Sequence, residues 1–303
     1  MEKIGQLFVL GFKGTFPSKK FISLLKDFQI GGVILFSENV SSSKNLKETI
    51  SYLQSQVKIP LFIMIDQEGG KVNRIKKGLP LFPSNRYFGE KNDPKEVYKA
   101  YKTTADALFE WGINVNLAPV VDVWTNPQNK VIKKRSFGKE PEKVAKLSAY
   151  VIKGIKAGKI FSCAKHFPGL GDAEIDPHFN LAVNTNPKER FEKNDFVPFK
   201  RAIKENVDLV MTTHILCPKL DQEFPATLSK KIINILRKEL GFKNLVITDD
   251  MEMGGMEKNF NITDACEKAF LSGHNLILIC HNWDKQIKIL KHFAKMYQED
   301  EKF

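Results

Sequence analysis

Short apolar runs alternate with amphipathic stretches along almost the whole chain. Runs rich in apolar and β-branched residues predict eight strands, over residues 6–12, 32–36, 60–66, 113–119, 160–166, 208–214, 244–249 and 275–280. Between them, apolar residues recur at helical spacing and predict helices over residues 18–28, 43–56, 94–111, 141–156, 187–204, 229–240, 262–271 and 285–296. Proline or serine stands near the start of several of these helices, where such residues favour the first turn. The pattern therefore predicts eight βα units.

The composition of the strands indicates how these units assemble. Near-continuous apolar runs such as residues 245–247 and 276–279 are typical of parallel strands that helices cover on both faces. Eight units in 303 residues fit a closed (β/α)8 barrel, whose usual length is about 250 residues. A doubly wound open sheet is the alternative, although no glycine-rich dinucleotide fingerprint follows the first strand. No low-complexity linker divides the chain. We expect an α/β protein with one TIM-type barrel domain over residues 1–303.

Polar residues stand at the carboxyl ends of the expected strands. The set consists of Asp66, Asp122, Lys165, His166, His214, Asp249 and Asp250. A barrel gathers strand ends around one axis, so that groups far apart in the sequence meet at one substrate. An open sheet would spread them along a crevice, and the distribution therefore favours the barrel.

Composition and charge exclude some classes of partner. The chain is 42% apolar and 27% charged, which is ordinary for a globular enzyme. Its net charge of +12 comes mostly from lysines scattered over polar helix faces, so nucleic acid is not expected, although a basic surface can steer an anionic substrate. The apolar stretch at residues 7–12 is too short for a signal sequence or a membrane span. We therefore expect a cytoplasmic protein that binds no membrane.

The cysteines give no sign of a metal site or a disulfide framework. Cys163, Cys217, Cys266 and Cys280 show no CxxC spacing. Most of them sit in or beside apolar runs, where a thiol packs as a small hydrophobic group. Neither structural zinc nor any cofactor is expected.

Residues 165–178 hold the densest set of reactive groups. Lys165 and His166 end an apolar strand, a loop broken by glycine and proline follows, and Asp176-Pro177-His178 comes after it. Connections in α/β units usually have about 2 to 6 residues, so the long stretch 167–186 is either functional or disordered. A carboxylate that fixes its tautomer would make His178 a general acid and base. The alternative is a solvated loop in which Asp176 and His178 only cap each other.

The segment Thr248-Asp249-Asp250 offers a carboxylate nucleophile at a strand end. The alternative is a pair of helix-capping aspartates after a strand. Side-chain alternation alone does not decide which of Asp249 and Asp250 points into the barrel.

These residues belong to motifs that resemble the β-N-acetylglucosaminidases of glycoside hydrolase family 3, in their bacterial single-domain form. The resemblance covers roughly residues 5–280. Its motifs are GGVILF at 31–36, DQEGGKVNR at 66–74, LAPVVDV at 117–123, RSFG at 135–138, the loop 165–178, PATLS at 225–229 and TDDMEM at 248–253. Their order along the chain makes the resemblance specific.

The resemblance implies a role for each candidate residue. Asp249 becomes the nucleophile, and Asp176 with His178 becomes the acid/base pair on a mobile loop. The groups that would hold the sugar hydroxyls and ring are Asp66, Arg74, Arg135, Lys165 and His166. The chain departs from the family where Leu170 replaces the histidine of a Gly-His-Gly segment and where Pro177 replaces the serine of Asp-Ser-His; the first change affects loop contacts and not the pair.

The implied reaction is retaining hydrolysis of a terminal β-linked N-acetylglucosamine through a covalent Asp249 intermediate. Participation of the substrate acetamido oxygen is the alternative to covalent attack, and phosphate is an alternative acceptor to water. The implied substrates are N-acetylglucosaminyl muropeptide or anhydromuramyl fragments from peptidoglycan recycling, and a monomer is expected. Two other classes stay open: a metal-dependent barrel hydrolase with His166, Asp176, His178 and His214 as ligands, and a non-catalytic sugar-binding barrel.

Overall fold

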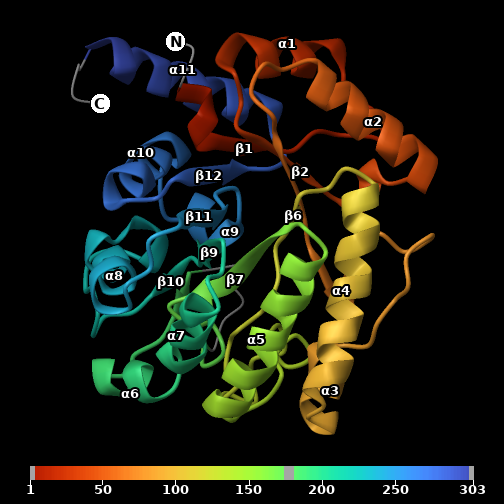
Figure 1. Cartoon of the computed structure of the whole chain (residues 1–303). Coiled ribbons are helices and arrows are strands. Elements are labelled where there is room, and N and C mark those ends of the chain that lie inside the picture. Colours follow the sequence, from red (N-terminus) through yellow and green to blue (C-terminus); the bar gives the residue numbers. More distant parts are fainter. Residues whose placement is uncertain (1–3, 174–180, 300–303) are drawn as a thin grey trace.

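A closed barrel of parallel strands organises the molecule. The computed structural model describes residues 4–173 and 181–299, and within them eight strands follow one another around the barrel in sequence order (Figure 1). They are β1 (Phe8–Leu10), β2 (Gly32–Leu35), β3 (Phe62–Ile65), β6 (Val115–Asn116), β7 (Phe161–Phe167), β9 (Leu209–Thr212), β11 (Leu245–Asp250) and β12 (Leu276–Ile279). Each strand pairs in parallel with both neighbours, and β12 closes the ring against β1. The expected TIM-type barrel is confirmed, and the open sheet is excluded.

Helices surround the barrel where the amphipathic pattern predicts them (Figure 1). They are α1 (Lys19–Phe28), α2 (Ser43–Ser55), α4 (Pro94–Glu110), α5 (Pro141–Ala157), α7 (Phe196–Lys204), α8 (Lys230–Asn234), α10 (Ile262–Ser272) and α11 (Trp283–Glu299). The side chains of Ser18 and Ser42 accept hydrogen bonds from the first turns of α1 and α2. Pro94 and Pro141 begin α4 and α5, where a missing N–H costs nothing. Among the described residues, no helix has the length and apolarity needed to cross a bilayer.

Two of the expected helices are not single regular α-helices. The single helix expected over 187–204 is divided into α6 (Lys188–Lys193) and α7, with the break at Asn194 and Asp195. Pro198 lies in the first turn of α7, a position where a helix tolerates proline, so it marks a helix start that the apolar period alone does not reveal. The helix expected over 229–240 begins as α8 and ends as a π-helical segment, η4 (Ile235–Glu239).

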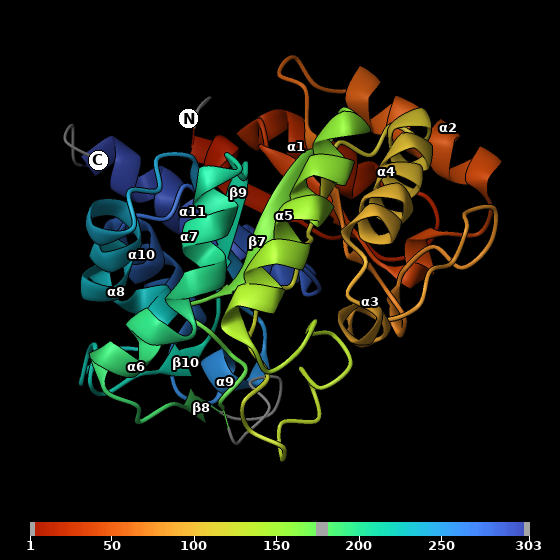
Figure 2. The same cartoon turned by 60° about the horizontal axis from the view of Figure 1, so that its bottom comes forward.

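Additional short elements gather beyond the carboxyl ends of the barrel strands. A hairpin of β4 (Gln67–Gly69) and β5 (Val72–Asn73) follows β3, and β8 (Ala182–Val183) pairs with β10 (Ile215–Leu216). The others are α3 (Asn85–Lys91), α9 (Gly254–Glu257) and the 3-10 turns η2 (Ser37–Asn39) and η3 (Ala226–Leu228), whereas the 3-10 turn η1 (Ile4–Leu7) precedes β1 at the amino end of the barrel. Figure 2 shows the long loop between β6 and α5 at the same end of the molecule as α9, β8 and β10. This end carries the connections that a TIM barrel uses for its site.

The core has an inner and an outer part. Side chains from every barrel strand fill the barrel interior, among them Val9, Met64, Leu209 and Ile247. The outward faces of the strands pack against the helices in two further apolar clusters. All four cysteines are buried, including those that the sequence places in or beside apolar runs. The barrel interior is therefore packed, and free space is found at its end.

Candidate active site

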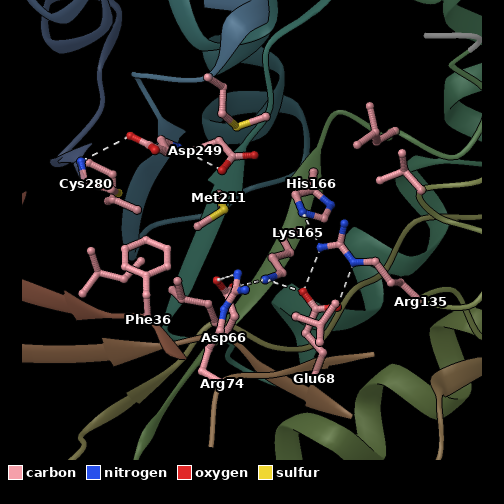
Figure 3. Close-up of a pocket in the computed structure, with 18 of the residues that line it drawn as sticks. Phe36, Asp66, Glu68, Arg74, Arg135, Lys165, His166, Met211, Asp249 and Cys280 are labelled. Carbon is pink, nitrogen blue, oxygen red and sulfur yellow. Dashed lines mark hydrogen bonds and ion pairs between the residues drawn. The ribbon is translucent and has the colours of Figure 1, made fainter. Parts of the chain in front are cut away.

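A cavity of about 500 Å³ opens at the carboxyl end of the barrel, within the size range of ligand pockets. All expected site residues that the structure describes line it (Figure 3). These residues are Asp66, Arg74, Arg135, Lys165, His166 and Asp249. Asp176 and His178 lie outside the described residues. The structure therefore brings together most of the groups that the strand-end pattern singled out, namely Asp66, Lys165, His166, Asp249 and Asp250.

Register shifts explain why neighbouring residues of two strands both line this cavity. The pairing of β7 with β9 shifts register between Lys165 and Phe167, and the pairing of β11 with β12 shifts between Ile247 and Asp250. A bulge or similar irregularity in a strand redirects the side chains beside it. Lys165 and His166 consequently share the cavity, as do Asp249 and Asp250. Strict alternation would have sent one member of each pair away from it.

Lys165 lies at the centre of a buried charge network. Its Nζ is 2.6 Å from Asp66 Oδ1 and 2.7 Å from Glu68 Oε1, and its side chain is only 2% exposed. Burial would lower the pKa of Lys165, but Asp66 and Glu68 outweigh this effect and raise it above its ordinary value. Lys165 is therefore a fixed cation.

Two arginines complete the network from opposite sides. Arg135 donates through Nε and Nη2 to both carboxylate oxygens of Glu68, at 2.9 and 2.8 Å, which is a bidentate arrangement. Arg74 Nη2 lies 3.1 Å from Asp66 Oδ2. Burial raises the pKa of both carboxyls, yet the cations outweigh it and leave each pKa below its ordinary value. Both carboxylates are therefore ionised and can accept hydrogen bonds from hydroxyl groups.

His166 is held in one orientation by two partners. Its Nδ1 lies 2.7 Å from Asp122 Oδ2, and its Nε2 lies 3.2 Å from Arg135 Nη2. Because a guanidinium can only donate, Nε2 accepts and the proton resides on Nδ1, where Asp122 accepts it. Asp122 Oδ1 also accepts the backbone N–H of Leu170 at 2.7 Å. The same carboxylate thus orients the imidazole and fixes the start of the long loop.

Asp249 occupies a different environment from Asp66 and Glu68. It lies at the end of β11, is partly exposed, and its Oδ1 accepts the backbone N–H of Asp250 at 2.9 Å. Among the described residues, no lysine or arginine comes within ion-pair distance of it. Figure 3 shows Asp249 and the Asp66–Arg74 pair on different sides of the cavity. An ionised carboxylate that is not neutralised by a cation keeps its electrons available for attack.

The structure identifies further residues that sequence reasoning did not assign to the site. Glu68 stands only two positions after Asp66. Because side chains alternate between the two faces of a strand, this spacing was the signal that Glu68 shares a face with Asp66. Asp122 was noted at a strand end but received no role. His281 also lines the cavity, two residues after the end of β12. The same strand-end reasoning would have found it one position beyond the expected strand.

His214 does not line the cavity, contrary to expectation. It is fully buried, and its Nδ1 and Nε2 lie 2.9 and 2.8 Å from Thr227 Oγ1 and the carbonyl oxygen of Asp250. His214 therefore supports the backbone of β11 from behind. Within residues 4–173 and 181–299, no histidines, cysteines and carboxylates are grouped as ligands for a metal ion.

The described part of the long loop is anchored to the loop after β6. Asn129 Nδ2 donates to the carbonyl oxygen of Leu170 at 2.7 Å, and Thr125 Oγ1 donates to Asp172 Oδ1 at 2.6 Å. Leu170, which departs from the family pattern, is buried and lines the cavity. The start of the loop therefore forms part of the cavity wall.

The chain is similar to known glycoside hydrolases over nearly its whole length. The family model described as glycosyl hydrolase family 3 N terminal domain matches residues 1–302. "Beta-hexosaminidase A" of Pseudoalteromonas piscicida is 37% identical over 279 residues, which are 84% of this chain and 46% of that protein. "Beta-hexosaminidase" of Nitrosomonas eutropha is 33% identical over 86% of this chain and 76% of its own. The chain thus spans about half the length of the first relative.

Solved structures show the same likeness. A glycoside hydrolase family 3 β-N-acetylglucosaminidase from Paenibacillus has a TM-score of 0.94 and 35% identity, and the match covers 96% of this chain and 56% of that one. NagZ from Neisseria gonorrhoeae, in complex with N-trifluoroacetyl-D-glucosamine, has a TM-score of 0.86 and 28% identity. The match covers 95% of this chain and 84% of the NagZ chain.

Proposed function

Because the chain belongs to glycosyl hydrolase family 3, through that family's N-terminal domain, we propose that it is a retaining β-N-acetylhexosaminidase. It releases terminal β-linked N-acetylglucosamine. The observation that carries this proposal is the single cavity in which the carboxylate of Asp249 meets the ion-paired set of Asp66, Arg74 and Lys165. Ionised donors and acceptors bind sugar hydroxyls, and a separate carboxylate attacks the anomeric carbon.

The first chemical step forms a glycosyl ester. Asp249 attacks the anomeric carbon, and the bond to the leaving oxygen breaks while His178, oriented by Asp176, donates a proton to that oxygen. The sugar is then bound covalently to Asp249, and His178 is neutral.

The second step restores both residues. Neutral His178 removes a proton from a water molecule, which attacks the anomeric carbon and displaces the carboxylate of Asp249. Two displacements at the same carbon retain its β configuration. Asp66, Arg74 and Lys165 hold the hydroxyls during both steps, while Glu68 keeps the two cations Lys165 and Arg135 in place.

The natural substrate is proposed to be an N-acetylglucosaminyl muropeptide or anhydromuramyl fragment, hydrolysed by a monomer in the cytoplasm during peptidoglycan recycling. Two observations support this substrate. Relatives are named for hexosaminidase activity and one neighbour binds an N-acylglucosamine. The net charge of +12 also favours approach of an anionic fragment.

The decisive experiment measures turnover of aryl β-N-acetylglucosaminides. We expect Asp249→Ala to reduce hydrolysis to background, because this variant lacks the carboxylate that attacks the anomeric carbon. We expect His178→Ala to reduce kcat by about 10²- to 10⁴-fold, and Asp176→Asn to reduce it less. The loss in His178→Ala should shrink with a dinitrophenyl leaving group, which needs little protonation.

Trapping identifies the nucleophile independently of these variants. A fluorinated N-acetylglucosaminide should label the peptide that contains Asp249, and peptide mapping locates the label. A label outside residues 248–253, or hydrolysis at the wild-type rate by Asp249→Ala, would overturn the proposal. Absence of any hydrolysis by the wild type would favour a non-catalytic sugar-binding barrel.

A further inference from the structure

A second carboxylate–imidazole pair lines the cavity. His281 follows β12 and Asp250 ends β11, and His281 Nε2 lies 3.2 Å from Asp250 Oδ2. The His281 side chain is 52% exposed, whereas that of Asp250 is 14% exposed. Asp250 directly follows the proposed nucleophile, so this pair lies beside the reacting centre.

Backbone hydrogen bonds fix the position of the pair. Glu252 accepts the backbone N–H groups of both His281 and Asn282. Asp250 Oδ1 accepts the N–H groups of Glu252 and Cys280, at 3.1 and 3.3 Å. The carboxylate that holds the imidazole is therefore itself held, which is typical of a preorganised site.

The imidazole presents one free nitrogen. The ring of Phe36 packs against that of His281, with centroids 4.8 Å apart, and Nε2 points to Asp250. Nδ1 has no hydrogen-bond partner among residues 4–173 and 181–299. Because His281 lines the cavity, this nitrogen is available to a ligand.

The charges around the cavity favour a cation at this position. Its described walls contain four carboxylates, Asp66, Glu68, Asp249 and Asp250, but only three permanent cations, Arg74, Arg135 and Lys165. A protonated His281 balances the set. Deprotonation of His281 leaves one excess negative charge among these walls.

The groups packed around His281 support its protonation. The hydrogen bond to Asp250 raises the pKa of His281 above its ordinary value. Partial burial acts to lower this pKa, but the negative charges of Glu252 and Glu38 also raise it. Two cations lie farther from His281. Arg74 lies over Phe36, 5.5 Å from the ring centre, and Lys285 lies 3.9 Å from Glu252.

We propose that His281 is a further substrate-contacting residue of this cavity, which donates a hydrogen bond from Nδ1, as an imidazolium held by Asp250, to an oxygen of the bound sugar. The inference rests on the proposed function and adds to it a residue on the wall formed by β12. It also has a consequence for pH. When His281 loses its proton, Nδ1 becomes an acceptor and the charge-assisted hydrogen bond is lost.

The experiment follows binding without relying on turnover. N-acetylglucosamine is added to the folded wild type, and the carbon-bound ring resonances of its six histidines are recorded by NMR across a pH series. His281→Asn assigns the His281 signal. We expect the sugar to shift this resonance and to raise the pKa of His281. We also expect the dissociation constant of the sugar, measured from the same titrations, to increase about 10-fold above that pKa in the wild type.

Matched variants separate contact from structure. His281→Asn and His281→Gln should bind N-acetylglucosamine about 10-fold more weakly at low pH and lose the pH dependence. His292→Gln is the control, because His292 pairs with Glu267 on α11 and α10, away from the cavity. We expect this control to retain wild-type binding at every pH. A far-ultraviolet circular dichroism spectrum confirms that each variant is folded.

The outcomes distinguish this inference from the proposed function. If the wild type hydrolyses aryl β-N-acetylglucosaminides but the His281 resonance does not respond to the sugar, the inference is wrong and the function stands. Unchanged dissociation constants and pH dependence in both folded His281 variants lead to the same conclusion. If the wild type neither binds N-acetylglucosamine nor hydrolyses its aryl glycosides, the proposed function fails first, and the inference with it.

Discussion

Glu68 connects the two halves of the charge network, and its replacement tests what holds the cavity together. It is 2% exposed and contacts Lys165 and Arg135. Glu68→Gln keeps the shape of the side chain but removes its negative charge. The buried cations Lys165 and Arg135 then lose the carboxylate that they share. Removing one partner of a buried ion pair typically costs about 3 to 5 kcal/mol. We expect a loss of this order in the free energy of unfolding, measured by urea titration at pH 7, together with weaker sugar binding.

An exposed pair of the same residue types serves as the control. Glu140 is 71% exposed and lies 2.8 Å from Lys143. Surface ion pairs contribute about 0 to 1 kcal/mol, so Glu140→Gln should have little effect. Equal losses in the two variants would show that burial does not determine the contribution of Glu68.

At the residue scale, the sequence reveals which strands carry functional groups but not how the groups pair. Asp66, Lys165 and Asp249 were predictable because each stands at a strand end. The role of Asp122 as the partner of His166 was not, because it depends on the register shift in β7 and on the path of the following loop. Neither feature has a period that can be read along the chain.

At the element scale, the long loop after β7 depends on one close backbone approach. A Cβ added to Gly171 would lie 1.9 Å from the carbonyl oxygen of Val123, so Gly171→Ala must displace one of the two loops. We expect this variant to lose about 1 to 3 kcal/mol of unfolding free energy. Because the loop carries His178, kcat/KM for an aryl β-N-acetylglucosaminide should also fall.

Gly138→Ala is the matched control for this prediction. The nearest atoms to a Cβ at Gly138 are 3.9 Å away, which is ordinary contact. We expect this variant to fold and to hydrolyse the aryl substrate as the wild type does. Wild-type stability and activity in Gly171→Ala would show that the contact with Val123 does not fix the loop.

Helix boundaries show what periodicity can and cannot predict. α4 begins at a proline and spans most of the residues expected from its pattern. The break between α6 and α7 was missed because the apolar period continues across it. The period reports which side of a segment faces the barrel, whereas the break follows from local backbone chemistry at Pro198.

At the scale of the whole molecule, barrel closure was predictable and the distribution of charge inside it was not. The repeated alternation of strands and helices requires only that each segment bury its apolar face. Asp195, in contrast, looks like a surface residue in the sequence, but it lies between α6 and α7, 1% exposed, with no hydrogen bond to its Oδ1. Its carboxyl group packs against Gly169 at the start of the long loop.

This buried carboxyl should make the stability of the whole protein depend on pH. Burial raises the pKa of Asp195 to about 7, whereas in the unfolded chain it ionises near 3.9. Between these values the folded state binds more protons, so the free energy of unfolding falls as pH rises from about 4 to about 7, by at most about 4 kcal/mol. Asp195→Asn, which does not titrate, should lack this contribution, whereas the exposed control Asp106→Asn should keep it. Urea titrations across this range test the difference, and parallel pH profiles for the wild type and Asp195→Asn would contradict it.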